Sequence, residues 1–276
     1  MNLSLFLIAG SALFYGLSFV LHLISFSGRN AHRVAFLLMR IAFLIGTFGL
    51  ASEAITEGFF LPVSDLSQAM AFFAWSLAFV YLVLLVKSQS ESFGLILSPV
   101  LFGLMAGAVT AKAHAGAPET PLPAALLNPY FVVHIAGAFF AYASFTLSFA
   151  AGALYLIQHR ELKSKHPGTF YHKLPSLEEL ERLIYQPLVW GAPLLAIAAG
   201  VGFIWSKSAY GEFWVWDPKT ILTGVTVALY SGILYLRYAA ALHGKRGALF
   251  SLFAFAVVLF SFLGARFIHG SHDYLR

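Results

Sequence analysis

Residues 205–220 read WSKSAYGEFWVWDPKT and stand between two long apolar runs. Three of the chain's five tryptophans, two further aromatic residues (Tyr210 and Phe213) and an Asp-Pro pair fall within these sixteen residues. The flanking runs, about Leu188–Ser206 and Lys219–Leu242, are each close to or above the length of about 20 residues that a helix needs to cross a bilayer. The stretch is therefore predicted to be an aromatic loop that joins two membrane helices.

The composition of the whole chain agrees with this frame. Hydrophobic residues make up 59% of the chain and charged residues 11%, with a mean hydropathy of +0.80, whereas a soluble domain carries about 25% charged residues. The sequence thus predicts an all-α polytopic membrane protein. The absence of cysteine excludes disulfides, thiolate metal sites and thiol redox chemistry in this chain. The net charge of +5, spread over short loops, gives no signal for nucleic acid.

Eight apolar runs are long enough to span a membrane, and we expect them to form a single transmembrane domain over residues 1–276. The first follows an N-terminus without basic residues, which favours a retained membrane helix over a cleaved signal peptide. The predicted spans are about Leu3–Phe26, Val34–Leu50, Ala69–Val86, Phe93–Ala111, Pro129–Ile157, Leu188–Ser206, Lys219–Leu242 and Ala248–Ile268.

The basic residues set the predicted orientation. Ten Lys and Arg residues follow the first, third, fifth and seventh runs, against five on the opposite side. Because cytoplasmic loops carry the excess of Lys and Arg, both termini and the loop 205–220 are predicted to lie outside the cytoplasm. The ten are Arg29, Arg33, Lys87, Arg160, Lys163, Lys165, Lys173, Arg182, Lys245 and Arg246.

The longest predicted cytoplasmic loop, residues 158–187, contains a helix start signal. Ser176 and Glu179 have the spacing of a capping box, and apolar residues follow at helical spacing. This pattern predicts a short amphipathic helix that lies on the cytoplasmic face. Its role is interpreted as structural, with docking of a partner as the alternative.

Two of the ten histidines are predicted to lie on the same side as the aromatic loop. His134 stands just inside the fifth run, and His272 follows the eighth. An imidazole near a bilayer interface needs a partner, so a functional role is a reasonable hypothesis, with a hydrogen bond to a backbone carbonyl as the structural alternative. His22, in the first run, is a weaker candidate for a second ligand site. Arg40 and Arg237 are interpreted as snorkelling cations, and Arg40 also as a partner for a propionate or a lipid phosphate.

Two imidazoles can hold haem iron from opposite faces of the macrocycle, and aromatic side chains can cover the porphyrin. Tyr210, Phe213, Trp214 and Trp216 supply such cover. The alternative is an interfacial belt, which explains single tryptophans at helix ends, such as Trp75, Trp190 and Trp205. Composition alone favours neither the binding loop nor the interfacial belt. Asp217 with Pro218 is explained as the cap and first residue of the next helix, although Asp217 can also border a ligand.

The stretch 210–219, YGEFWVWDPK, resembles the W-G-x-x-W-x-W-D-P-K-E signature of the CcsA/ResC-type cytochrome c assembly proteins, which belong to the WWD-domain haem-handling family with CcmC and CcmF. Three other segments are similar to elements of the CcsA branch. They are Phe60 to Leu66 with Phe72 to Trp75, His134 with Ala141-Tyr142-Ala143, and Phe262-Leu263-Gly264 with Gly270 to Tyr274.

The resemblance implies a haem b site on the outer face of a bacterial cytoplasmic membrane. His134 and His272 would be the axial ligands of the iron, and Tyr210, Gly211, Phe213, Trp214, Trp216 and Asp217 would border the porphyrin. Such proteins present haem for covalent attachment to apocytochrome c, as the haem-delivering subunit of a synthase completed by a CcsB/ResB-like membrane protein. Thiol-reducing partners keep the apocytochrome cysteines available.

Four departures mark the chain as a divergent member, and one of them is Asp65-Leu66-Ser67-Gln68 in place of the family's N-L-Y-E. Tyr210 replaces the first tryptophan of the signature, and Thr220 replaces its glutamate. Tyr235 stands where the CcsA branch has a histidine thought to bind haem in transit, so the inner site is expected to be lost. Two other functions therefore remain open: a HemX-like regulator or scaffold of tetrapyrrole metabolism without haem transfer, and a carrier of another amphipathic ligand such as a quinone.

Overall fold

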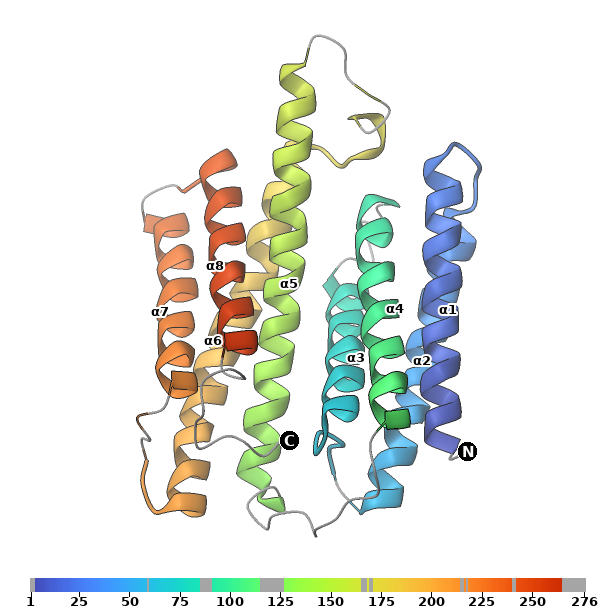
Figure 1. Ribbon diagram of the computed structural model, residues 1–276. Helices are drawn as coiled ribbons and strands as arrows, with labels where there is room; N and C mark the ends of the chain where they lie inside the picture. The colour runs from blue at the N-terminus through green and yellow to red at the C-terminus, as the bar shows by residue number, and fades with distance from the viewer. Residues whose placement is uncertain are drawn as a thin grey trace. The chain divides into compact units, whose positions relative to one another are not determined.

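The computed structural model describes residues 3–58, 60–84, 91–114, 127–164, 168, 171–213, 216, 218–239 and 242–264. Within these ranges the regular elements include α-helices and a short 3-10 helix, Tyr171–Lys173. The helices divide into two compact units, Met1–Leu122 and Pro123–Arg276, each with four α-helices (Figure 1). The predicted all-α architecture is confirmed. That the two units act as a single transmembrane domain stays a prediction.

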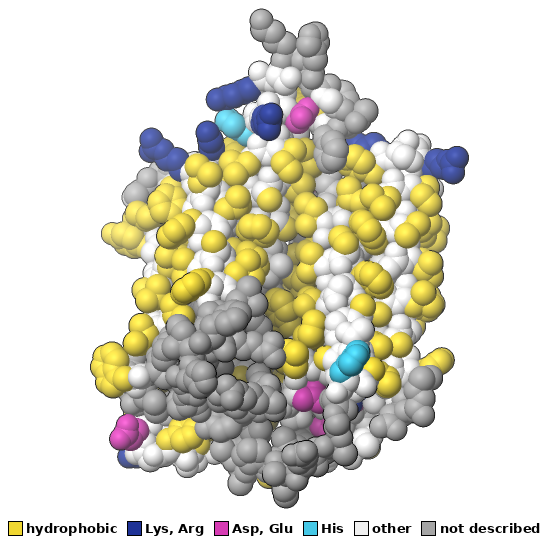
Figure 2. Space-filling view, viewed as in Figure 1, with side chains coloured by type: hydrophobic (Ala, Val, Ile, Leu, Met, Phe, Trp, Pro, Cys, Tyr) yellow, Lys and Arg dark blue, Asp and Glu magenta, His cyan; other side chains and the backbone are white. Residues whose placement is uncertain are grey.

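The helices follow the apolar runs, and most extend beyond them. The first unit contains α1 (Leu3–Phe26), α2 (His32–Glu57), α3 (Leu66–Leu84) and α4 (Glu91–His114), and the second contains α5 (Pro129–Lys163), α6 (Leu177–Tyr210), α7 (Pro218–Ala239) and α8 (Gly244–Gly264). Over the described residues, all of these except α8 are long and apolar enough to cross a membrane. Hydrophobic side chains cover the middles of the helices, and Lys and Arg side chains lie near helix ends (Figure 2). The chain is a polytopic membrane protein.

In the first unit, α1 packs against α2 and α4 through a buried row of small and polar side chains. The Ser11 and Ser18 hydroxyls donate hydrogen bonds of 2.8 Å to the carbonyls of Ala42 and Ala35 on α2. In a bilayer, where lipid tails offer no hydrogen bonds, hydroxyl groups at helix interfaces hold neighbouring helices together in this way. His22 is fully buried in the same row, and its Nδ1 donates to the Ser18 carbonyl at 2.9 Å. Its ring lies against Gly94, where a Cβ would collide with Nε2, so in this unit His22 is a packed core residue.

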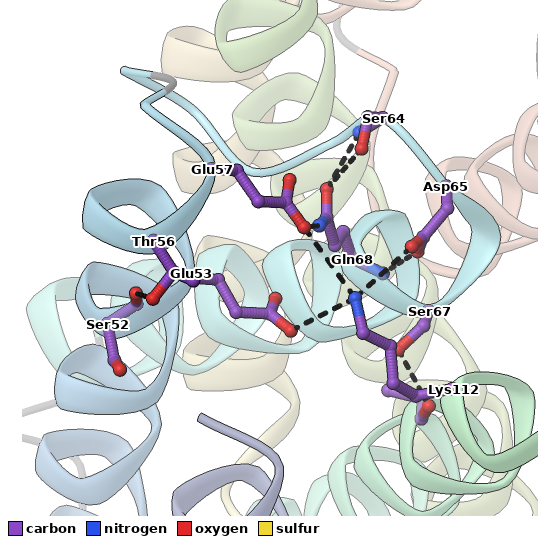
Figure 3. Close-up of polar contacts among 10 residues, drawn as sticks. Ser52, Glu53, Thr56, Glu57, Ser64, Asp65, Ser67, Gln68 and Lys112 are labelled. Atoms are coloured by element: carbon purple, nitrogen blue, oxygen red, sulfur yellow. Dashed lines mark hydrogen bonds and ion pairs between the residues drawn. The ribbon is translucent and has the colours of Figure 1, made fainter. Parts of the chain in front are cut away.

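A polar cluster joins the ends of α2, α3 and α4 (Figure 3). The Lys112 ammonium lies 3.4 to 3.7 Å from carboxylate oxygens of Glu53, Glu57 and Asp65. Asp65 also caps α3, because its Oδ1 accepts from the Gln68 backbone N–H at 2.8 Å. Asp65 therefore both starts α3 and pairs with Lys112.

In the second unit, α5 and α6 form a long antiparallel pair with close backbone approach. A Cβ on Gly137 would lie 2.9 Å from the Ala198 Cβ, and one on Gly191 would lie 2.8 Å from the Ser144 Cβ. Because glycine has no side chain, the two helices approach each other more closely at both positions than larger residues would allow.

The predicted short helix on the cytoplasmic face is not a separate element. Ser176 caps a helix as expected, because its hydroxyl accepts from the Glu179 N–H at 3.2 Å. That helix then continues without a break to Tyr210 as α6. Leu180, Leu183 and Ile184 are buried against the rest of the unit. This part of α6 therefore packs its apolar face within the protein, and its position on the cytoplasmic face stays a prediction.

Arg237 is also placed differently from the sequence interpretation, which had it snorkelling. Its guanidinium donates to Glu181 Oε1 at 2.8 Å and lies 4.5 Å from the Tyr185 ring centroid. Glu181 Oε2 accepts from the Gly244 N–H at 3.2 Å, and the Tyr185 hydroxyl donates to the Leu242 carbonyl at 2.6 Å. Arg237 therefore ties α6, α7 and the start of α8 together rather than reaching toward lipid headgroups.

Candidate functional site

The first turn of α5 is fixed to the last turn of α6 at the end of the unit that carries the aromatic loop. The Asn128 side chain accepts from the Tyr130 N–H at 2.9 Å, which caps α5 just before Pro129. Its amide also donates to the Ser208 hydroxyl at 3.0 Å. The same residue thus starts one helix and holds it to the end of the other, less than two turns before His134.

His134 lies at this end of α5 and turns its ring toward α6. Its Nδ1 is 2.7 Å from the Ala198 carbonyl oxygen. Since a carbonyl only accepts, Nδ1 carries the proton, and in the neutral ring the lone pair belongs to Nε2. This is the arrangement usual for metal-ligating histidines, whose other nitrogen donates to a carbonyl or a carboxylate.

Trp205, interpreted from the sequence as a belt residue, is instead part of the interior of this end. Only 3% of its surface is exposed. The His134 ring is stacked on it, with centroids 6.2 Å apart and planes 11° apart, and Phe131 contacts it at 5.2 Å. Its position seven residues after Ala198 places both on one face of α6. This spacing is the signal that sequence reasoning missed.

The loop residues then become more exposed with distance from Trp205. Tyr210 packs edge-on against Trp205 at 5.7 Å, and Gly211 ends α6 with a φ of 84°, a left-handed conformation that glycine adopts readily. Lys207 donates to the Gly211 carbonyl at 2.7 Å and lies over the Phe213 ring. Phe213 is 59% exposed and Trp216 is 81% exposed. Gly211 was predicted to border a ligand. Its left-handed conformation at the end of α6 is a second, purely structural reason for a glycine at this position.

Three of the predicted site residues lie outside the described residues, namely Trp214, Asp217 and His272. The helix after the loop begins at Pro218, as the Asp-Pro pair predicts. The structure therefore brings His134 and Tyr210 together around Trp205, and the second predicted ligand stays a prediction.

Tyr235, which replaces the histidine of the predicted inner site, lies on α7 and is 70% exposed in its unit. Tyr230, five residues earlier, is buried and stacks on Phe145 of α5 with centroids 3.6 Å apart. The helix thus packs on α5 through Tyr230 and turns Tyr235 away from the core of the unit.

Comparison with known proteins identifies the family. Residues 63–272 match the model of the cytochrome c assembly protein family. The chain belongs to the cytochrome c assembly protein family. The match begins just before α3 and extends through His134 and the aromatic loop to residue 272.

Named members of the family match nearly the whole chain. The protein HemX of Brevibacillus brevis is 32% identical over 95% of this chain and 93% of its own length. The protein HemX of Bacillus subtilis is 30% identical over 91% and 88%. The cytochrome c biogenesis protein CcsA of Pyropia yezoensis is 27% identical over 88% and 87%. The chain is thus similar to family members with two different names, and two of them are bacterial.

Proposed function

We propose that this protein binds haem b at the end of α5 and α6 and presents it for attachment to apocytochrome c. The observation that carries the proposal is the state of His134. Its Nδ1–H is donated to the Ala198 carbonyl, so Nε2 is the nitrogen with the lone pair that iron requires. Membership of the cytochrome c assembly family and similarity to a CcsA protein support the assignment of the ligand.

The residues present at this end fit a haem in chemistry as well as in ligand type. A porphyrin offers two large apolar faces, and exposed aromatic rings are the side chains that cover such faces best. Phe213 and Trp216 are exposed, and Tyr210 lies at the edge of the buried rings. In the proposal His134 and His272 hold the iron while Tyr210, Phe213, Trp214 and Trp216 border the ring. Bound haem supplies the vinyl groups to which cysteine thiols add.

The chain's own task in this proposal is to bind and orient. With no cysteine of its own, it does not compete for the vinyl groups. A CcsB/ResB-like membrane protein would complete the complex, and thiol-reducing partners would act on the apocytochrome. The positive-inside orientation would place the site on the external side of a bacterial cytoplasmic membrane.

An absorption spectrum of the detergent-purified protein tests haem binding. We expect a low-spin haem signal in the wild type, retained in His159→Ala and lost or converted to high spin in His134→Ala and in His272→Ala. His159 is a suitable control because it lies on the same helix, near its other end. Added imidazole should restore the low-spin signal in His134→Ala. A wild-type protein that carries no haem from a haem-replete host, and takes up none when haem is added, would refute the proposal.

A second function has support from the comparisons. The two HemX proteins are more similar to the chain than the CcsA protein of Pyropia yezoensis, and Tyr235 replaces the inner histidine of the CcsA pattern. In this alternative the chain regulates or scaffolds tetrapyrrole metabolism and transfers no haem. Co-expression with apocytochrome c and a CcsB/ResB-like partner separates the two, because only the first proposal predicts covalently bound haem on the cytochrome after denaturing electrophoresis.

A further inference from the structure

Three residues of α6 contact the His134 ring from one side. Ala198, Gly202 and Trp205 stand at the spacing i, i+4 and i+7, which places them on one face of the helix. Ala198 accepts the Nδ1 hydrogen bond and Trp205 stacks on the ring, as described above. A Cβ built on Gly202 would lie 2.6 Å from Nδ1 and 2.8 Å from Cε1 of His134. The imidazole therefore occupies the space that any other side chain at position 202 would take.

The surroundings of Gly202 differ from those of the glycines that serve helix packing. At Gly137 and Gly191 the closest atom to a built Cβ belongs to Ala198 or to Ser144, small residues of the facing helix. At Gly202 the three nearest atoms all belong to the His134 ring. Close approach of two backbones explains the first two glycines. The third is explained by the imidazole alone.

We propose that Ala198, Gly202 and Trp205 form an imidazole seat that fixes the tautomer and the ring plane of His134. The inference rests on the proposed function, in which His134 is a haem ligand, and it assigns positioning residues that act through His134. The Ala198 carbonyl holds the proton on Nδ1 and makes Nε2 a more basic ligand. Gly202 admits the ring to within reach of that carbonyl, and Trp205 holds its plane.

Two glycine substitutions on the same helix test the seat. Gly202→Ala places a methyl group against the imidazole, whereas a Cβ on Gly200 meets nothing within 4 Å. Both changes raise intrinsic helix propensity by the same amount, so any difference between them reflects the surroundings. The first measurement uses haem-free protein labelled with nitrogen-15 histidine, with the His134 signals assigned by their loss in His134→Ala. We expect Nδ1–H in the wild type and in Gly200→Ala, and loss of that form in Gly202→Ala.

The second measurement is the affinity for added haem. Loss of an outer partner of a ligating histidine lowers metal affinity by about 10- to 100-fold, so we expect a loss of that order in Gly202→Ala and none in Gly200→Ala. Trp205→Phe should keep the Nδ1–H form, because it leaves the carbonyl in place, and should weaken haem binding less than Gly202→Ala.

The outcomes separate the seat from the function of the site. If the wild type binds haem and Gly202→Ala keeps both the tautomer and the affinity, the seat is refuted and the haem site stands. If the wild type binds no haem, the proposed function fails, and the nitrogen-15 signals alone decide whether the seat exists. Should Gly202→Ala not fold, an Nε2–H tautomer of His134 in the folded wild type would overturn the inference.

Discussion

Helix α6 carries two very different clusters at its two ends. Near its start, Glu181 and Tyr185 join Arg237 and the main chain at Leu242 and Gly244 in a closed set of ion pairs and hydrogen bonds. At its other end, Trp205 and Tyr210 join His134 and Phe131 through ring contacts.

The two clusters also differ in what they present to their surroundings. Glu181 and Arg237 have side chains that are a quarter exposed or less, and each is engaged by partners on a neighbouring helix. At the aromatic end exposure rises from the buried Trp205 through Tyr210 and Phe213 to Trp216. A closed polar network fixes helices in place, because each group has its partner within the protein. The graded row of rings leaves apolar surface exposed at its outer end, which is the surface that the proposed haem site would use.

The largest effect on stability is expected at the buried ring of the aromatic end. Trp205→Ala removes the side chain that contacts Phe131, His134 and Tyr210, and such core truncations lower the free energy of unfolding by about 3 kcal/mol or more. Thermal unfolding in detergent measures the change. Trp190→Ala is the control, because Trp190 is 65% exposed on the same helix and should change stability by about 0.5 kcal/mol or less. Equal destabilisation by the two would contradict the prediction, because it would mean that the ring contacts of Trp205 add no stability beyond that of an exposed tryptophan.

A smaller effect is expected at the polar end. Arg237→Leu leaves the Glu181 carboxylate without its closest cation and the Tyr185 ring without its cation contact. Removing one partner of a partly buried pair should lower the free energy of unfolding by about 2 kcal/mol, less than for a fully buried pair. Haem binding should be unchanged in the folded fraction, because the cluster lies at the opposite end of α6 from His134. Lys245→Ala, an exposed cation on α8, serves as the control. A loss of haem in Arg237→Leu at full stability would contradict the separation of the two ends.

The helices and several of their ends follow directly from local sequence. Apolar runs of sufficient length predicted each helix, and Ser176 and Pro218 marked starts because a cap and a first-turn proline act within their own turn. The same local signals did not show where the helix after Ser176 ends. A short separate helix was predicted, whereas the helix continues to Tyr210 with Leu180, Leu183 and Ile184 buried.

The errors at single residues have one physical cause. Arg237 was interpreted as snorkelling because its partner Glu181 is 56 residues away, and no local pattern connects the two. Trp205 was assigned to the belt because burial by Phe131 and His134 depends on the register between α5 and α6. From the sequence, the predicted topology placed His134 on the same side of the membrane as the aromatic loop. It could not predict that the His134 ring contacts α6. The role of Gly202 could not be predicted from local sequence, because it depends on the position of His134 on the facing helix α5.

The smallest expected effect on stability, and the sharpest test of the aromatic end, is at Trp216. Trp216→Leu should change the free energy of unfolding by about 0.5 kcal/mol or less, because the side chain is 81% exposed. If Trp216 borders a porphyrin, the same change should weaken haem binding several-fold, since an aromatic contact contributes about 0.5 to 1.5 kcal/mol beyond its area. Tyr238→Leu on α7 is the matched control, with 74% exposure and a position outside the loop. A selective loss of haem affinity in Trp216→Leu favours the binding surface. Equal effects of the two changes would mean that these rings meet lipid and detergent alike, and the interfacial belt would then be the better interpretation of the loop.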